Sequence, residues 1–428
     1  MTTRTNKLLA SAASVLCAIQ AHADDAGSFD DRITGDWSGL RSSLAEGGVN
    51  LTLGYVGEWV HNTSGGERSS TAYADQIAFG ADLNLDTLIG WRGASFHGIV
   101  TNRNGPQLDA KAGFGTLLET HELYGRGHYT RLTRFYLQQQ LLDERVTIKL
   151  GRSDVDFFPF SCDFINISFC GALPGYHSNG WYTWPIGQFF ANVTIEAGAG
   201  RYIKVGANDV NPRNLEGDQG LRLHTRDDRQ RGTLANLEMG WLPTSGSELP
   251  GSYRIGYWRN STSYPDLLLN EERAPMPVAG GAPLMRDSST GYYALAFQQI
   301  TNNGSGGGLT VFANFSHSDG NVNKVDRLLS LGLWYEGWFP FRPDDRLGLA
   351  IGHNRVSKRF RDFERLSHEV AGAHGLDRGA EVPIELNYTV AGARGFMLMP
   401  SLQYVRNAGG RRDADDIWIF GVKLSAEF

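Results

Sequence analysis

Apolar and polar side chains alternate at every second position in many short stretches of this chain, most clearly at its C-terminus. One face of residues 417–428 is apolar and consists of Trp418, Phe420, Val422, Leu424, Ala426 and Phe428. The other face includes Lys423, Ser425 and Glu427. A period of two places successive side chains on opposite faces of a β-strand. The pattern therefore predicts strands with one apolar and one polar face.

Similar runs, separated by turn-forming residues, predict about sixteen strands. Their approximate limits are 48–62, 75–88, 91–102, 130–142, 145–153, 188–198, 200–210, 232–243, 251–262, 290–301, 307–318, 327–341, 345–357, 380–392, 396–407 and 415–428. Some connections are as short as Ala199-Gly200, whereas others are long. Short turns that alternate with long loops are typical of outer-membrane barrels. We expect an all-β fold, a transmembrane antiparallel up-and-down β-barrel.

Strands are the only elements of this sequence suited to crossing a bilayer. The longest uncharged stretch, residues 164–195, contains Pro174 and Pro185, so it does not form an apolar helical span. A closed barrel is the other structure that pairs every backbone group within hydrocarbon. The mean hydropathy of −0.31 fits a wall of which only one face meets lipid. A soluble β-sandwich or propeller is the alternative, but no blade-length repeat is present.

The N-terminus has the parts of a secretory signal peptide. Arg4 and Lys7 precede the apolar residues 8–19, and Ala21-His22-Ala23 has the A-x-A form of a cleavage site. We expect residues 1–23 to be removed, residues 24–47 to form a periplasmic segment, and residues 48–428 to form the barrel. Loss of the two basic residues leaves 38 basic against 46 acidic residues, a net charge of −8. This balance argues against nucleic acid as a partner.

One short helix is predicted before the first strand. Asp36 is positioned to cap residues 38–46, with Leu40 and Leu44 on one face, and Gly47-Gly48 follow as a stop signal. We expect this helix to rest on the periplasmic mouth of the barrel, with Arg41 directed either to solvent or towards the lumen.

Two cysteines remain after removal of the signal peptide, Cys162 and Cys170. In an exported protein such a pair predicts a local disulfide that closes a short loop, and two free thiols are the alternative. A structural zinc site needs four ligands, and no second cysteine pair supplies them. We expect no metal and no cofactor.

Residues suited to sugar recognition concentrate between positions 152 and 185. Aromatic faces pack on the C–H surfaces of sugars, and guanidinium, carboxylate and amide groups bond to their hydroxyls. This stretch carries Arg152, Asp163, Asn166, Trp181 and Trp184. We predict that residues 153–187 form a loop that folds into the barrel and narrows it. An external loop packed on its own aromatic residues fits the composition equally well.

Inward positions on the wall add charged groups to this loop. If Val146, Ile148 and Leu150 face outward, Lys149 faces inward, and the same alternation directs Arg134 and Glu385 inward. Charged side chains at membrane depth face water or one another. The basic side of the predicted constriction is formed by Arg134, Lys149 and Arg152. Its acceptor side is formed by Asp163, Asn166 and Glu385. The two residues predicted to stack on the sugar are Trp181 and Trp184.

Sequence motifs for catalysis are weak. The chain has no G-x-S-x-G, no H-E-x-x-H and no phosphate-binding loop. We therefore predict that the chain is not an enzyme, and an outer-membrane hydrolase built from scattered histidines is kept as a minor alternative.

An ordered series of loose motifs resembles the carbohydrate-selective porin family of Gram-negative outer membranes, the OprB type. The matching segments are residues 34–41, 131–139, 146–152, 164–171, 185–186, 205–212, 385–388, 400–405 and 409–410. Ser38, Asn208 and Asn407-Ala408 depart from the family pattern. The resemblance implies a sixteen-stranded barrel that admits monosaccharides, commonly glucose, by facilitated diffusion.

The function predicted from these observations is diffusion of monosaccharides through a water-filled lumen with a weak sugar-binding constriction. A general or cation-preferring porin is the alternative that the net charge of −8 favours. We expect outer-membrane lipid and lipopolysaccharide as partners, and either a homotrimer or a monomer.

Overall fold

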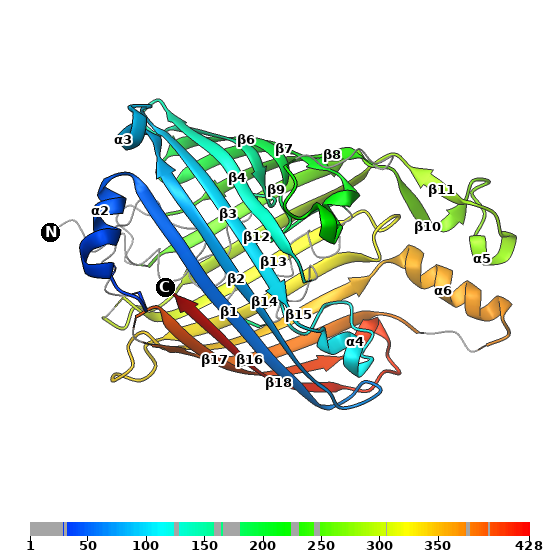
Figure 1. Cartoon of the computed structure of the whole chain (residues 1–428). Coiled ribbons are helices and arrows are strands. Elements are labelled where there is room, and N and C mark those ends of the chain that lie inside the picture. Colours follow the sequence, from blue (N-terminus) through cyan, green and yellow to red (C-terminus); the bar gives the residue numbers. More distant parts are fainter. Residues whose placement is uncertain are drawn as a thin grey trace.

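Sixteen antiparallel strands of the described chain close into one barrel, in which β1 pairs with β18 (Figure 1). The structure is a computed structural model that describes residues 29, 32–123, 128–157, 164–165, 180–223, 231–243, 249–304, 306–373, 377–392 and 394–428. The predicted signal peptide and four predicted site or disulfide residues, Cys162, Asp163, Asn166 and Cys170, lie outside the described residues.

The barrel strands follow the chain in order, each antiparallel to the next. They are β1 (Val49–Ser64), β2 (Thr71–Asn84), β3 (Ala94–Asn104), β4 (Thr130–Leu141), β5 (Val146–Ser153), β6 (Gln188–Gly198), β7 (Arg201–Val210), β8 (Gly232–Trp241), β9 (Gly251–Asn260), β12 (Ser289–Gln299), β13 (Gly308–Ser318), β14 (Val325–Glu336), β15 (Arg346–Val356), β16 (Ala380–Ala391), β17 (Phe396–Arg406) and β18 (Ile417–Glu427). The predicted barrel and its strand number are confirmed.

Short elements occupy the connections. A separate hairpin, β10 (Tyr264–Asn270) with β11 (Pro283–Arg286), lies between β9 and β12. The helices are α2 (Leu40–Glu46), α3 (Leu85–Ile89), α4 (Leu108–Ala112), α5 (Met276–Ala279) and α6 (Lys358–Val370), and the 3₁₀ turns are η2 (Trp37–Gly39), η4 (Pro212–Leu215), η5 (Gly217–Gln219) and η6 (Ala408–Gly410). None of the described helices is long and apolar enough to cross a membrane.

The outer and inner faces of the wall follow the predicted alternation. In β18, Trp418 and Phe420 are each 42% exposed, whereas Ile419 and Lys423 are buried. The exposed apolar face is the surface that meets lipid, and the buried face points into the barrel. Alternation of this kind lets one strand serve a hydrocarbon exterior and a polar interior together.

The two ends of the barrel differ. The C-terminus and α2 lie at one end, which we call the terminal end, whereas α4, α5, α6 and the β10–β11 hairpin lie at the other, the loop end (Figure 1). The terminal end is fastened by backbone hydrogen bonds: Ile33 N donates to Glu427 O at 2.9 Å, and Phe428 N donates to Leu53 O at 3.0 Å. The N-terminal segment is thus tied to the seam where the barrel closes.

The N-terminal helix begins later than predicted. Ser38 has φ +60° and Gly39 has φ +91°, so the regular helix starts at Leu40. Asp36 accepts from Ser42 N and Oγ, at 2.8 and 2.7 Å, instead of occupying the N-cap. Arg41 faces neither solvent nor lumen water, because its guanidinium lies between the rings of Phe29 and Trp37, at 4.9 and 4.8 Å.

The second strand is also shifted from its prediction. Residues 75–88 were expected to be extended, but β2 ends at Asn84 and α3 follows. Asn84 caps this helix by accepting from Asp86 N and Thr87 N, at 3.0 and 3.1 Å. The side chain offers the first helical amides a partner, and this local capping ends the strand.

Placing a charge on the lipid-facing surface tests the assignment of faces. Leu331 lies in the middle of β14 and is 44% exposed on the outer face. Leu331→Arg is expected to lower the free energy of unfolding in a bilayer by about 2–4 kcal/mol, because its charge would enter hydrocarbon. Denaturant titration in lipid vesicles measures this effect, with Leu331→Ala as the control for loss of packing. Equal stability of the two variants would contradict the assignment.

Candidate functional site

Two described residues of the chain after β5, Phe164 and Ile165, lie against the wall opposite β5. The backbone N of Ile165 donates to Glu385 Oε1 at 2.8 Å, and β16, which carries Glu385, lies almost opposite β5 in the barrel order. Glu385 is fully buried and alternates along β16 with the exposed Leu386, so it faces inward. Residues 164–165 therefore lie inside the barrel, against the far wall.

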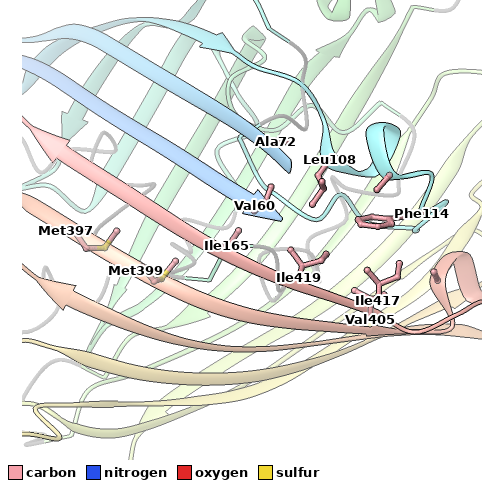
Figure 2. Close-up of a cluster of buried hydrophobic side chains, with 12 residues drawn as sticks. Val60, Ala72, Leu108, Phe114, Ile165, Met397, Met399, Val405, Ile417 and Ile419 are labelled. Carbon is pink, nitrogen blue, oxygen red and sulfur yellow. The ribbon is translucent and has the colours of Figure 1, made fainter. Parts of the chain in front are cut away.

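Glycines on the far wall make room for these two side chains. A Cβ added at Gly348 would lie 2.9 Å from Phe164 Cζ, and one added at Gly421 would lie 3.0 Å from Ile165 Cδ1. Figure 2 shows Ile165 beside Ile419 and Met399 in a buried apolar cluster. Phe164 and Ile165 thus pack directly on the backbone of the wall, in positions that a larger residue would close.

The near end of the segment is held by ion pairs to the inner face of β4, β5 and β7. Arg134 Nε contacts Asp154 Oδ1 at 3.3 Å. Asp156 Oδ2 lies 3.0 Å from Lys149 Nζ and 3.2 Å from Lys204 Nζ. Asp154 and Asp156 therefore pair with three cations of the wall, and one positive charge remains in excess.

Asp156 lies just beyond β5, between two ammonium groups. Burial by itself raises the pKa of this carboxyl, but Lys149 and Lys204 outweigh burial and hold the pKa well below its usual range. The carboxylate therefore remains ionised at physiological pH, and the site presents fixed positive and negative charges side by side.

Aromatic groups surround this charged cluster. The Lys149 Nζ lies 5.7 Å from the centre of the Tyr136 ring, and the Arg134 guanidinium lies 5.1 Å from that of Trp184. Trp184 Nε1 donates to Gln76 Oε1 at 2.9 Å, which fixes the plane of the indole. The side chains of Lys149 and Asp156 keep 23% and 20% of their surface exposed. The cluster thus offers charged groups beside aromatic rings.

Three of the predicted site residues are brought together here, and others are placed elsewhere. Arg134, Lys149 and Trp184 gather around Asp154 and Asp156. Trp181 is only 1% exposed, because it packs against Trp258 with ring centres 5.8 Å apart. This position gives Trp181 a packing role. Glu385, on the far wall, accepts the amide of Ile165 and lies 3.2 Å from Asn387 Nδ2.

Arg152 is separated from this cluster. It is paired in register with Phe135 and Phe189, both exposed on the outer face, and its Nε donates to Leu132 O at 3.3 Å. Strict alternation would direct Arg152 outward, opposite to Lys149, but its side chain is buried, at 2% exposed, beside Gly151, whose φ of +148° interrupts the regular strand. Arg152 was predicted to be a site residue because of its guanidinium group, although the alternation along the strand did not favour an inward side chain.

A second inward segment, residues 105–123 after β3, was not predicted. Leu123 N donates to Glu58 Oε2 at 3.1 Å, and Leu117 N donates to Glu381 Oε2 at 2.7 Å. Glu122 in this segment lies 3.0 Å from Lys423 Nζ on β18. Glu58 and Glu381, at inward positions of β1 and β16, could have indicated such a segment, because buried carboxylates require hydrogen-bond donors.

The arrangement suits binding of a neutral hydroxylated solute more than it suits a reaction. Fixed donors and acceptors lie beside flat aromatic rings, and backbone amides of Ile165, Leu117 and Leu123 bond to inward carboxylates of the wall. In the part of the chain that the structure describes, no group of three or more His, Cys, Asp or Glu side chains is placed to hold a metal ion.

A larger side chain at Gly348, beneath Phe164, tests whether the segment after β5 narrows the lumen. Gly348→Val introduces overlap with Phe164, an overpacking cost of about 1–3 kcal/mol that displacement of the segment relieves. We expect a higher single-channel conductance in planar bilayers. Gly98→Ala is the control, because its added Cβ makes only ordinary contact with Phe96, at 3.6 Å. An unchanged conductance in a correctly folded Gly348→Val barrel would contradict the role of the segment.

Comparisons with known proteins agree with this geometry. The sequence model of the carbohydrate-selective porin, OprB family, matches residues 68–428. The chain is 34% identical to Porin B of Pseudomonas aeruginosa, over 95% of this chain and 94% of that protein. It is 29% identical to the putative porin QuiX of Acinetobacter baylyi, over 97% of this chain and 98% of that protein.

The fold comparison leads to the same group of proteins. The high-pH structure of Pseudomonas putida OprB superimposes with a TM-score of 0.90 and 31% identity, covering 95% of this chain and 100% of that one. The chain therefore belongs to the OprB family of carbohydrate-selective porins of the outer membrane.

Proposed function

We propose that this porin passes monosaccharides of the glucose type down their concentration gradient into the periplasm. The loop end faces the exterior and the terminal end faces the periplasm, as short turns at one end and long loops at the other favour. Solute enters between the loops, passes the two inward segments and leaves beside α2.

The observation that carries this proposal is the partly exposed pair Lys149–Asp156 beside Tyr136 and Trp184. A pyranose offers C–H surfaces and adjacent hydroxyls, and this cluster offers ring faces, a donor and an acceptor within one region. Binding of an ion would require only the charged groups. The aromatic rings beside them therefore favour a sugar as the solute.

Binding at this cluster has to be weak for transport to proceed. A solute that bound tightly would occupy the constriction and stop flow. Lys149 and Asp156 already satisfy each other, at 3.0 Å, so a sugar hydroxyl has to compete with an existing ion pair. The paired arrangement therefore supports recognition without a deep energy minimum.

Replacing Trp184, the half-buried tryptophan of the cluster, tests sugar recognition. Trp184→Ala is expected to weaken glucose block of the ion current about fivefold, since an aromatic contact contributes about 1 kcal/mol. Planar-bilayer recordings with increasing glucose give the block constant. Trp241→Ala, on the outer face, removes an equal side chain away from the lumen and should leave the block unchanged. If glucose did not block the wild-type current, the general-porin alternative would be favoured.

Replacing the shared carboxylate separates sugar selectivity from ion selectivity. Asp156→Asn leaves Lys149 and Lys204 without their anion, so the reversal potential in a salt gradient should move towards anion preference, and glucose uptake by liposomes should fall. Asp143→Asn, in the turn between β4 and β5, removes the same charge outside the lumen and is the control. A shift in ion preference with unchanged sugar uptake would contradict a sugar contact at Asp156.

A further inference from the structure

Three basic side chains lie side by side on the outer face of the barrel, near the loop end. His317 on β13 is opposite Arg327 on β14, and Arg327 is opposite Arg355 on β15. Neighbouring strands are about 4.8 Å apart, so these groups form one short basic row. Arg327 is exposed, and it alternates along β14 with the buried Leu328.

An acid balances one residue of this basic row, but not Arg327. Arg355 is paired with Asp326, with Nη2 to Oδ2 at 2.8 Å. Arg327 has no ion pair with any residue in the described ranges, although two basic groups flank it. Like charges directly opposite in a sheet are destabilising. An anion seated on Arg327 would relieve this repulsion.

Further basic groups extend the row towards the next strands. His353 is exposed on β15, two residues before Arg355 and on the same face of the strand. Arg406 lies on β17 opposite Val382. Asp416, the acid nearest in register to Arg406, accepts from Tyr404 Oη at 2.6 Å. The patch formed by His317, Arg327, His353, Arg355 and Arg406, here called the basic rim, sets three arginines against Asp326 and Asp416, so Arg327 gives it a positive excess.

Below the basic rim the same outer face is apolar. Leu331 and Ile351 are 44% and 43% exposed, and Leu402 is 43% exposed. At the terminal end of β14 and β15 the outward positions are apolar or aromatic, namely Leu333, Tyr335, Leu347 and Leu349. The cations therefore occur at one end only of an apolar surface. This pattern fits a ligand with phosphates above acyl chains.

We propose that the basic rim binds the phosphate groups of lipopolysaccharide, whose acyl chains cover the apolar surface below. The proposal rests on the orientation given under the proposed function, in which the loop end lies in the outer leaflet. Arg327 contributes the free guanidinium, Arg355 and His317 flank it, and His353 and Arg406 extend the contact to further phosphates. A guanidinium matches the planar, bidentate geometry of a phosphate.

Titration of the full purified chain in detergent with lipopolysaccharide tests the proposal. Arg327→Gln should weaken binding about tenfold, because it removes a charge-assisted pair, whereas Arg327→Lys should recover part of the affinity. Arg201→Gln, at an exposed position of β7 at the terminal end, is the matched control and should bind normally. Heat-dependent gel mobility verifies that each variant is a closed barrel.

Competition identifies the ligand. Dephosphorylated lipopolysaccharide should bind weakly, and neither inorganic phosphate nor vesicles of phosphatidylglycerol should compete at equal phosphate concentration. Equal competition by either one, or an unchanged affinity of a folded Arg327→Gln barrel, would overturn the proposal. Glucose block measured on the same samples should be identical to wild type. If glucose did not block the ion current of the wild type, that result would contradict the proposed sugar transport but not the proposed binding of lipopolysaccharide.

Discussion

Every backbone amide and carbonyl within hydrocarbon needs a hydrogen-bond partner. Neighbouring strands supply most of these partners, and the pairing of β1 with β18 supplies those of the last two edges. The pairing runs from Gly54 with Glu427 to Ser64 with Trp418. Without it the sheet would expose two edges to lipid. Closure also creates the lumen, since the inward side chains of sixteen strands then face one another. The N-terminal segment is tied to the same seam, through Ile33 and Glu427.

Closure then determines where the two inward segments are held. Inward carboxylates that become covered need donors, and the two inward segments supply backbone amides. Glu385 accepts from Ile165, Glu58 from Leu123 and Glu381 from Leu117. The wall therefore positions the segments by accepting their amides, and Glu385 acts first as an anchor.

The strands were predictable because a period of two is a local property of the sequence. The start of α2 and the change from β2 to α3 depended on positive φ at Ser38 and on the cap at Asn84, which the alternation does not report. Lys149 was placed correctly by parity, whereas Arg152 was chosen for its chemistry and lies apart. Trp181 was selected as an aromatic residue in a suitable segment, and its burial depends on Trp258, which is distant in sequence. Contacts across the lumen require the closed barrel.

The net charge of −8 favoured a cation-preferring pore, but the distribution of charge weakens that interpretation. Asp154 and Asp156 are each within ion-pair distance of wall cations, so the acids of the constriction are neutralised where they stand. Selectivity follows from the few charged groups that keep contact with lumen water, because exposed charges beyond about one Debye length are largely screened. Lys149 and Asp156 are such groups and carry opposite signs. Under the proposed function a neutral polyol bonds to both groups at once, whereas an ion of either sign is attracted by one of them and repelled by the other.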